Sequence, residues 1–244
     1  MEDIRAERIA REYNAKMSAR LNWLTVALNQ FRSSLWAPGA GVRLIGGLAD
    51  YALMPEVRTI LEDDDSEEAT QEVIVAKLTS ILPTLTDKWA QQVREDFSVL
   101  AHNALGTTAI AQDADVLDLS VVAFQCRKCS WPRAMRWPEV ANHLCLKGRK
   151  EIDTDAYEKF TYDVYLRNHQ RVEMAYVGAA ERISIDRSYP CLREVVLTCG
   201  LEPTTAKRAD LDGCGVRLRC RLCARIVKQE VFDWEGAVSP PENP

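Results

Sequence analysis

Two Cys-x-x-Cys pairs constrain this 244-residue chain more than any other feature of its sequence. The pairs are Cys126/Cys129 and Cys220/Cys223, and each follows a short stretch that is typical of a β-strand. A gap of two residues lets both thiolates of a tight turn face one metal ion. In a reducing compartment such pairs indicate metal sites before they indicate disulfides. We therefore expect a small domain in the second half of the chain that a metal ion stabilises.

The segment FQCRKCSWPRAMRWPEVANHLC adds two more donors to the first pair. Thirteen residues separate Cys129 from His143, and Cys145 comes two residues after that histidine. Structural zinc sites are four-coordinate and use Cys and His side chains. We therefore predict that the ligands are Cys126, Cys129, His143 and Cys145. A short helix starting near residue 138 would carry His143, and it must end between His143 and Cys145 if both are to reach one ion.

The second pair has no histidine at the matching position, which leaves three alternatives open. Cys220 and Cys223 could recruit Cys199 or Cys214, or they could complete the first site in place of Cys145, or they could bind nothing. In the strongest form of the second alternative, the two pairs supply four thiolates to one ion.

If the two pairs share one ion in this way, His143 and Cys145 have another role. We include Cys220 and Cys223 among the expected zinc ligands, and we expect them within about 10 Å of the first pair, the spacing of packed layers. The three remaining cysteines are interpreted as small buried residues of the core: Cys191, Cys199 and Cys214.

The first half of the chain has the spacing of amphipathic helices, with apolar residues three and four apart. We expect helices from Ile9 to Phe31, over residues 42–51, from Pro55, from an N-cap at Ser66 to Leu82, and from Trp89 to Gly106, with an interruption at Pro83.

This period is lost over residues 107–120, which places the domain boundary there. Residues 121–124 and 216–219 are expected as strands, and residues 191–199 as a helix that Gly200 ends. The predicted fold is a mainly α N-terminal helical domain, residues 1–112, followed by a small α+β zinc-stabilised C-terminal domain, residues 113–244.

Basic residues surround both Cys-x-x-Cys pairs, although the whole chain carries a net charge of −5. Residues 124–150 carry +6 and residues 216–230 carry +4. Trp131 and Trp137 lie among the first group, a combination that suits backbone contacts and base stacking in nucleic-acid binding. Basic residues also offset the negative charge of a zinc–thiolate centre. Nucleic-acid binding is therefore the alternative to a protein-interaction role.

Several functional classes lack their motifs in this sequence. It contains no phosphate-binding loop, dinucleotide-binding turn, nucleophile elbow or His-Glu-x-x-His, and three histidines are too few for the usual His-rich catalytic zinc. It also has no run of 18 apolar residues and no signal-peptide core, so we expect no membrane partner and an intracellular location, cytoplasmic or nuclear. We predict a non-enzymatic, adaptor-like zinc-binding protein that binds another protein.

The segments LDLSVVAFQCRKC, WPEVANHLC, CLREVVLTCGLEP and VRLRCRLC resemble the Cys-rich C-terminal part of F-box-like proteins from mushroom-forming fungi. The resemblance extends from about Trp89 to about Val238. It implies zinc ligands at the positions of the two Cys-x-x-Cys pairs and of the His-x-Cys. The family tends to have a histidine after the second pair's valine, which this chain lacks, and no F-box with its Leu-Pro motif is present here.

Overall fold

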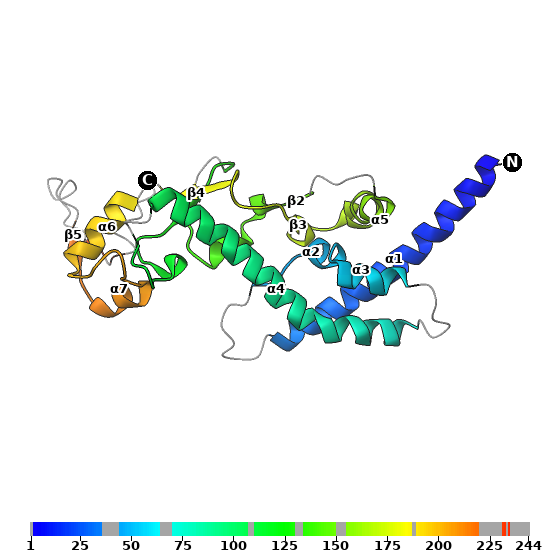
Figure 1. The fold of residues 1–244 in the computed structure, drawn as a ribbon, viewed down its shortest axis with the longest axis horizontal. Helices are drawn as coiled ribbons and strands as arrows, with labels where there is room; N and C mark the ends of the chain where they lie inside the picture. Colours follow the sequence, from blue (N-terminus) through cyan, green and yellow to red (C-terminus); the bar gives the residue numbers. More distant parts are fainter. Residues whose placement is uncertain are drawn as a thin grey trace. The chain divides into compact units, whose positions relative to one another are not determined.

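The computed structural model describes residues 2–35, 44–63, 70–106, 110–129, 134–149, 155–186, 189–219, 231–232 and 234 (Figure 1). The structure is mostly helical, with short two-stranded antiparallel sheets. The chain forms two compact units: unit 1 is Met1–Val93 with Leu146–Val177, and unit 2 is Arg94–Cys145 with Gly178–Pro244. Because each unit contains two separate segments, this division differs from a single boundary near residue 113.

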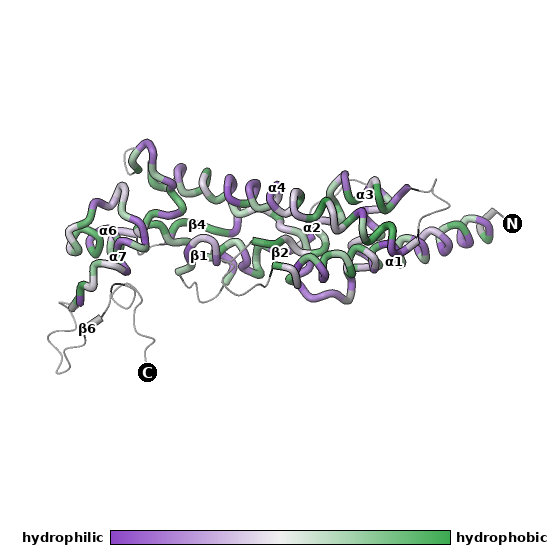
Figure 2. The backbone as a smooth tube through the Cα atoms, turned by 90° about the horizontal axis from the view of Figure 1, so that it is seen from below, coloured by the Kyte–Doolittle hydropathy of each residue, from purple (hydrophilic) through white to green (hydrophobic). Residues whose placement is uncertain are grey.

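Helix α1 (Glu2–Leu35) supplies one wall of the core of unit 1. The predicted apolar face is buried over its second half, at Met17, Leu21, Leu24, Leu28 and Phe31. Ile9, by contrast, is 55% exposed, so the face is buried only beyond the first turns of the helix. Hydrophilic and hydrophobic residues alternate along α1 in Figure 2, as expected of a helix with one buried face.

Two short helices and a long one follow in the chain: α2 (Leu48–Ala52), α3 (Pro55–Glu62) and α4 (Gln71–Leu105). The helix predicted from Pro55 is confirmed, whereas Val42 lies outside the described residues and α2 begins at Leu48. Ser66, the expected N-cap, also lies outside them. The described helices include none that is long and apolar enough to cross a bilayer.

The expected interruption at Pro83 is wrong, because α4 continues through this residue. A proline inside a helix removes one backbone hydrogen bond and costs about 3 kcal/mol. Leu78, Leu82 and Leu85 flank the proline and are buried, each contributing about 1.5–3 kcal/mol on burial. Burial on both sides of the proline therefore outweighs its local cost. Gly106, with φ of 77°, ends the helix as predicted.

The second segment of unit 1 packs its aromatic residues into the same core. It contains β2 (Lys147–Gly148), α5 (Ala156–Phe160), a short π-helix η5 (Thr161–Tyr165), the 3-10 helices η6 (Leu166–Asn168) and η7 (Arg171–Glu173), and β3 (Ala175–Tyr176). The hydroxyl of Tyr157 donates to the carbonyl oxygen of Ala52 at 2.8 Å. Strands β2 and β3 pair antiparallel, with Lys147 opposite Tyr176.

A buried ion pair joins the two segments of unit 1. The Nζ of Lys147 lies 3.1 Å from Oδ2 of Asp50, and their side chains are 3% and 1% exposed. The carboxylate of Asp50 also accepts the backbone N–H groups of Gly47 and Tyr176, at 2.9 and 2.7 Å. The ammonium lies 5.0 Å from the ring centroid of Trp89. The carboxylate thus has three partners and the ammonium two, as buried charges require.

Gly47 allows a close approach of two backbone segments in unit 1, and its replacement gives a direct test of the packing. A Cβ at this position would lie 2.7 Å from the carbonyl oxygens of Val172 and Met174. We expect Gly47→Ala to lower the free energy of unfolding by about 1–3 kcal/mol, the usual cost of overpacking, in urea unfolding.

Gly213→Ala is the matched control, because a Cβ there meets nothing within 4 Å inside a helix. We expect this substitution to be neutral or to stabilise by up to about 1 kcal/mol. Equal unfolding midpoints for the two variants would contradict the backbone contact at Gly47.

Unit 2 begins with the end of α4 and continues through η2 (Val116–Asp118), β1 (Phe124–Cys126), η3 (Glu139–Asn142), η4 (Leu144–Leu146, whose last residue belongs to unit 1) and β4 (Ile183–Ile185). The first predicted strand is shifted, since residues 121–123 precede β1 and the strand starts at Phe124. Strand β1 pairs antiparallel with β4, with Cys126 opposite Ile183. The ring of Phe97 on α4 makes an edge-on contact with Phe124, at 5.1 Å between centroids.

The last described elements of unit 2 are α6 (Tyr189–Thr198), α7 (Arg208–Cys214), β5 (Leu218–Arg219) and β6 (Val231–Phe232). The predicted helix that ends before Gly200 is confirmed, and Gly200 has φ of 76°. Strands β5 and β6 pair antiparallel, with Leu218 opposite Phe232. Backbone hydrogen bonds from Ala111 to Thr204 and from Ser120 to Ala206 connect the two segments of unit 2.

Candidate metal centre

The first arm of the candidate centre is the turn that follows β1. Strand pairing with β4 fixes Cys126, which is 2% exposed. The backbone N–H of Arg127 then donates to the carbonyl oxygen of Arg182 at 2.8 Å, which extends the pairing by one residue. The backbone N–H of Lys128 turns inward and donates to Sγ of Cys126 at 3.3 Å. The chain therefore reverses between Cys126 and Cys129, and both thiols face the same side.

The second arm contains His143 and Cys145, between two 3-10 turns. Turn η3 is anchored by Val140 and Ala141, which are fully buried, and it ends at Asn142. His143 is extended, with φ of −64° and ψ of 127°, and η4 starts at the next residue. The break in the helix thus falls at His143. A guanidinium N–H of Arg182 donates to the carbonyl oxygen of Cys145 at 2.7 Å and holds this residue in place.

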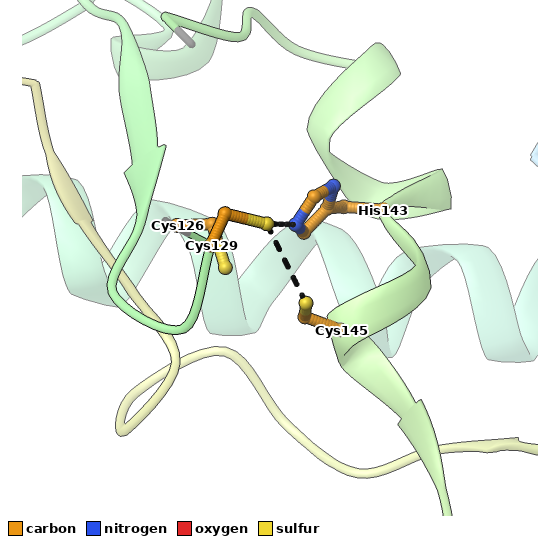
Figure 3. Close-up of side chains that lie close together, drawn as sticks. All are labelled: Cys126, Cys129, His143 and Cys145. Atoms are coloured by element: carbon orange, nitrogen blue, oxygen red, sulfur yellow. Dashed lines mark hydrogen bonds between the residues drawn. The ribbon is translucent and has the colours of Figure 1, made fainter. Parts of the chain in front are cut away.

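The two arms bring four donor atoms together (Figure 3). Sγ of Cys129 lies 3.3 Å from Nε2 of His143 and 3.7 Å from Sγ of Cys145. All four donor atoms, including Sγ of Cys126, lie within 4.8 Å of one another. The side chains point toward a common centre in the figure. The cluster of Cys126, Cys129, His143 and Cys145 could therefore hold a metal ion.

The thiols of this cluster influence one another's ionisation. Burial opposes ionisation of Cys126, yet hydrogen bonds from the backbone N–H groups of Lys128 and Cys129 and from neighbouring thiols lower its pKa overall. The neighbouring thiol of Cys145, with burial and Cys126, raises the pKa of Cys129 to about 11. One thiolate in the cluster therefore disfavours a second one, and a bound cation would relieve this repulsion.

The other cysteines divide into three groups. Cys220 and Cys223, the second predicted pair, lie outside the described residues. Cys191 is exposed, so its interpretation as a buried core residue is wrong; Cys199 and Cys214 are half-buried. One alternative was a single ion bound by the four thiolates of the two pairs, with another role for His143 and Cys145. In the structure, His143 and Cys145 both cluster with the first pair.

Arg182 contacts both arms, although its position in the sequence does not indicate this role. Its backbone carbonyl oxygen accepts from the first arm and its guanidinium donates to the second. It lies 37 residues beyond Cys145 in a polar turn. No local pattern separates such an arginine from an ordinary exposed one, so only the pairing of β1 with β4 reveals it.

Several basic residues near the first pair have partners within the protein. Lys147 is in the buried ion pair, and Arg149 pairs with Asp163. Arg136 donates to the carbonyl oxygens of Ser120 and Val122 at 2.8 and 3.3 Å. Arg127 and Lys128 are exposed. Arg133 and Lys150 lie outside the described residues, so the +6 segment is not one continuous basic surface among those described.

Two tryptophans, Trp131 and Trp137, lie within this basic segment of the sequence. Trp137 is half-buried, with its ring 5.7 Å from that of Phe97 and 5.6 Å from the guanidinium carbon of Arg94. Trp131 lies outside the described residues. Trp137 thus packs against side chains of its own unit.

No family model, curated protein or solved structure matches this chain. The resemblance to fungal F-box-like proteins therefore rests on the quoted residues alone.

Proposed function

We propose that the Cys3His cluster binds one zinc ion and that this ion is structural. With Zn–S bonds of about 2.3 Å, a tetrahedral site places neighbouring sulfurs about 3.8 Å apart. The 3.7 Å between Sγ of Cys129 and Sγ of Cys145 is close to this value and carries the proposal. Three thiols and one imidazole are a donor set that zinc favours. All four donor atoms lie within 4.8 Å of one another, so a contraction of at most about 1 Å would bring them to this spacing.

A four-ligand site of this kind favours a binding protein over an enzyme. Catalytic zinc keeps a coordination position open for water or substrate, whereas four protein donors fill the tetrahedral shell. We propose a non-enzymatic protein-interaction module, adaptor-like in the sense of the F-box-like resemblance, in a reducing intracellular compartment where thiols remain available.

The proposed zinc site predicts the metal content of the purified protein. In reducing buffer we expect at least one zinc ion per chain by elemental analysis, and one fewer in Cys129→Ser, because three donors do not close a structural site. Cys191→Ser, a matched change at an exposed cysteine, should retain the wild-type content. Wild-type protein without stoichiometric metal would refute the site.

Nucleic-acid binding remains a second candidate, favoured by the exposure of Arg127 and Lys128 beside the cluster. Binding through such residues weakens steeply with salt, since each phosphate contact releases counterions. Under the protein-interaction proposal, we expect no saturable binding of random single-stranded RNA or DNA between about 50 and 200 mM salt. Salt-dependent binding that is lost in Arg127→Ala/Lys128→Ala would favour the nucleic-acid role instead.

The partner itself can be sought by crosslinking in cells that express the chain, followed by nuclease treatment. We expect the same crosslinked proteins with and without nuclease. Loss of all partners on nuclease treatment would overturn the protein-interaction proposal and leave the zinc proposal untouched.

A further inference from the structure

Unit 1 has a surface groove that the metal centre does not involve. The groove has a volume of about 600 Å³ and lies between the second half of α1 and the first turns of α4. Its apolar lining comes from Val26 on α1 and from Val75 and Ala76 on α4, and Val26 is 37% exposed. Two helices with apolar residues between them form the kind of groove that accepts one face of a third helix.

The rim of this groove is negatively charged. Among the described residues that line it, Glu72 alone carries a charge, and it is exposed in the first turn of α4. Gln30 and Gln71 add uncharged polar side chains beside it. A matching occupant is therefore a helix that presents an aliphatic side chain beside a basic one.

The first turns of α1 have this combination of side chains. Residues 4–10 are all exposed, and the exposed fraction of Ile4 is 69%. Arg5 follows Ile4 directly, and Arg8 lies one turn further along the same helix. In Figures 1 and 2 these turns extend beyond the other helices of unit 1. Moving an exposed isoleucine into an apolar groove removes its side chain from water, which is favourable.

A chain cannot place these turns in its own groove. Helix α1 is continuous from Glu2 to Leu35, and Val26 lies 22 residues beyond Ile4. At 1.5 Å per residue, the two residues are about 33 Å apart along a single helix. If the first turns of α1 fill this groove, they must therefore come from a second copy of the chain.

The spacing of residues along α1 makes two copies complementary. Ile4, Ala15 and Val26 follow one another at intervals of 11 residues, close to three turns, so they lie on one face of the helix. If two α1 helices run antiparallel with Ala15 at a two-fold axis, Ile4 of each copy lies against Val26 of the other. Ala15 is small and exposed, which lets the helices approach at the axis. Both contacts then form at once, as in any isologous interface.

The same arrangement brings opposite charges together. Arg5 and Gln30 are 25 residues apart, close to seven turns, so they lie on the same flank of this face. Gln30 lines the groove, and a two-fold axis keeps the matching flanks of two antiparallel helices on one side. Arg5 of one copy therefore faces Glu72 across the groove of the other.

We propose that two copies of this chain associate through antiparallel α1 helices, each placing Ile4 in the groove of the other and Arg5 against its Glu72. Each copy fills the groove of its partner, so the assembly closes as a dimer. The proposal concerns unit 1 alone and does not rest on the zinc site proposed for unit 2.

Sedimentation equilibrium of the full chain across a concentration series tests the pairing. We expect a monomer–dimer equilibrium for the wild type. Ile4→Asp and Val26→Lys should each raise the dissociation constant about tenfold or more, because each disrupts a central contact twice per dimer. Both residues are exposed, so both variants should keep the wild-type unfolding midpoint. An equimolar mixture of the two variants should recover the dimer, since one Ile4–Val26 contact remains and the other joins the two introduced charges.

The charged residues allow a second test. Arg5→Glu should raise the dissociation constant about fivefold, as expected for exposed charges, and Arg5→Glu/Glu72→Arg should restore the wild-type value. Arg167→Glu makes the same charge change at another exposed arginine of unit 1. This control should leave the equilibrium unchanged.

Two results would overturn the pairing. One is a wild type that remains monomeric at every concentration, which would leave the groove to a helix of another protein. The other is a dimer that Ile4→Asp and Val26→Lys both leave intact, which would place the contact elsewhere on the chain.

Discussion

Cys126→Ser is expected to abolish the protection of unit 2 against hydrogen exchange while the core of unit 1 stays protected. Zinc contributes about 10–16 kcal/mol to the folding of zinc-finger peptides, as much as the whole stability of a typical domain, about 5–15 kcal/mol. Unit 1 has its own apolar core, which spans α1 to α5 and contains none of the four cluster residues. The measurement is hydrogen exchange by mass spectrometry, comparing peptides of α6 with peptides of α1.

The matched control for this prediction is Cys191→Ser, which changes an exposed cysteine of unit 2 and should alter stability by no more than about 0.5 kcal/mol. Chelation of the wild type should reproduce the effect of Cys126→Ser. A single transition that exposes α1 and α6 together would show that the two units do not unfold separately. Full protection of α6 after metal removal would show that the ion is not structural.

Asp50→Ala is expected to have the largest effect on unit 1, a loss of about 3–5 kcal/mol in the free energy of unfolding. The substitution leaves the ammonium of Lys147 buried without its carboxylate and removes the acceptor for the N–H groups of Gly47 and Tyr176. Urea unfolding monitored by exchange in α1 would measure it.

The ion pair on the surface of unit 1 provides the comparison. Glu56 lies 2.8 Å from Lys88, with side chains 44% and 63% exposed, and Glu56→Ala should cost less than about 1 kcal/mol. In the double variant Asp50→Ala/Lys147→Met no unpaired charge remains, so part of the loss should be recovered. Equal losses for Asp50→Ala and Glu56→Ala would contradict the burial of the pair.

The helices of unit 1 were largely predictable, because their signals are local. The face of α1 from Met17 onward follows from residue spacing, and Pro55 marks the start of α3. The continuation of α4 through Pro83 was not predictable, since a local rule gives the cost of the proline but not the burial of Leu78 and Leu82 that exceeds it. The exposure of Ile9 likewise depends on how far the rest of the unit extends along α1.

The candidate site was predictable from spacing because its four donors lie within 20 residues of sequence. The sequence predicted a helix break between His143 and Cys145, whereas the break falls at His143 itself, since η3 ends at Asn142 and η4 starts at Leu144. Contacts between residues far apart in the sequence could not be predicted from local spacing. The sequence places Lys147 in a basic segment, but its partner Asp50 lies 97 residues away, so the buried ion pair was not predicted.

The interleaved order of the two units has a consequence for the growing chain. Residues 94–145, which carry all four residues of the Cys3His cluster, leave the ribosome before the second segment of unit 1, residues 146–177. At about 5–20 residues per second, about 1–3 seconds of translation separate Cys145, which completes the donor set, from Phe160 in the core of unit 1. The nascent chain thus presents the complete donor set to metal while α1 to α4 still await Tyr157 and Phe160. Under the proposal that this cluster binds zinc, the supply of zinc during synthesis, and not only after release, would affect how each new molecule begins to fold.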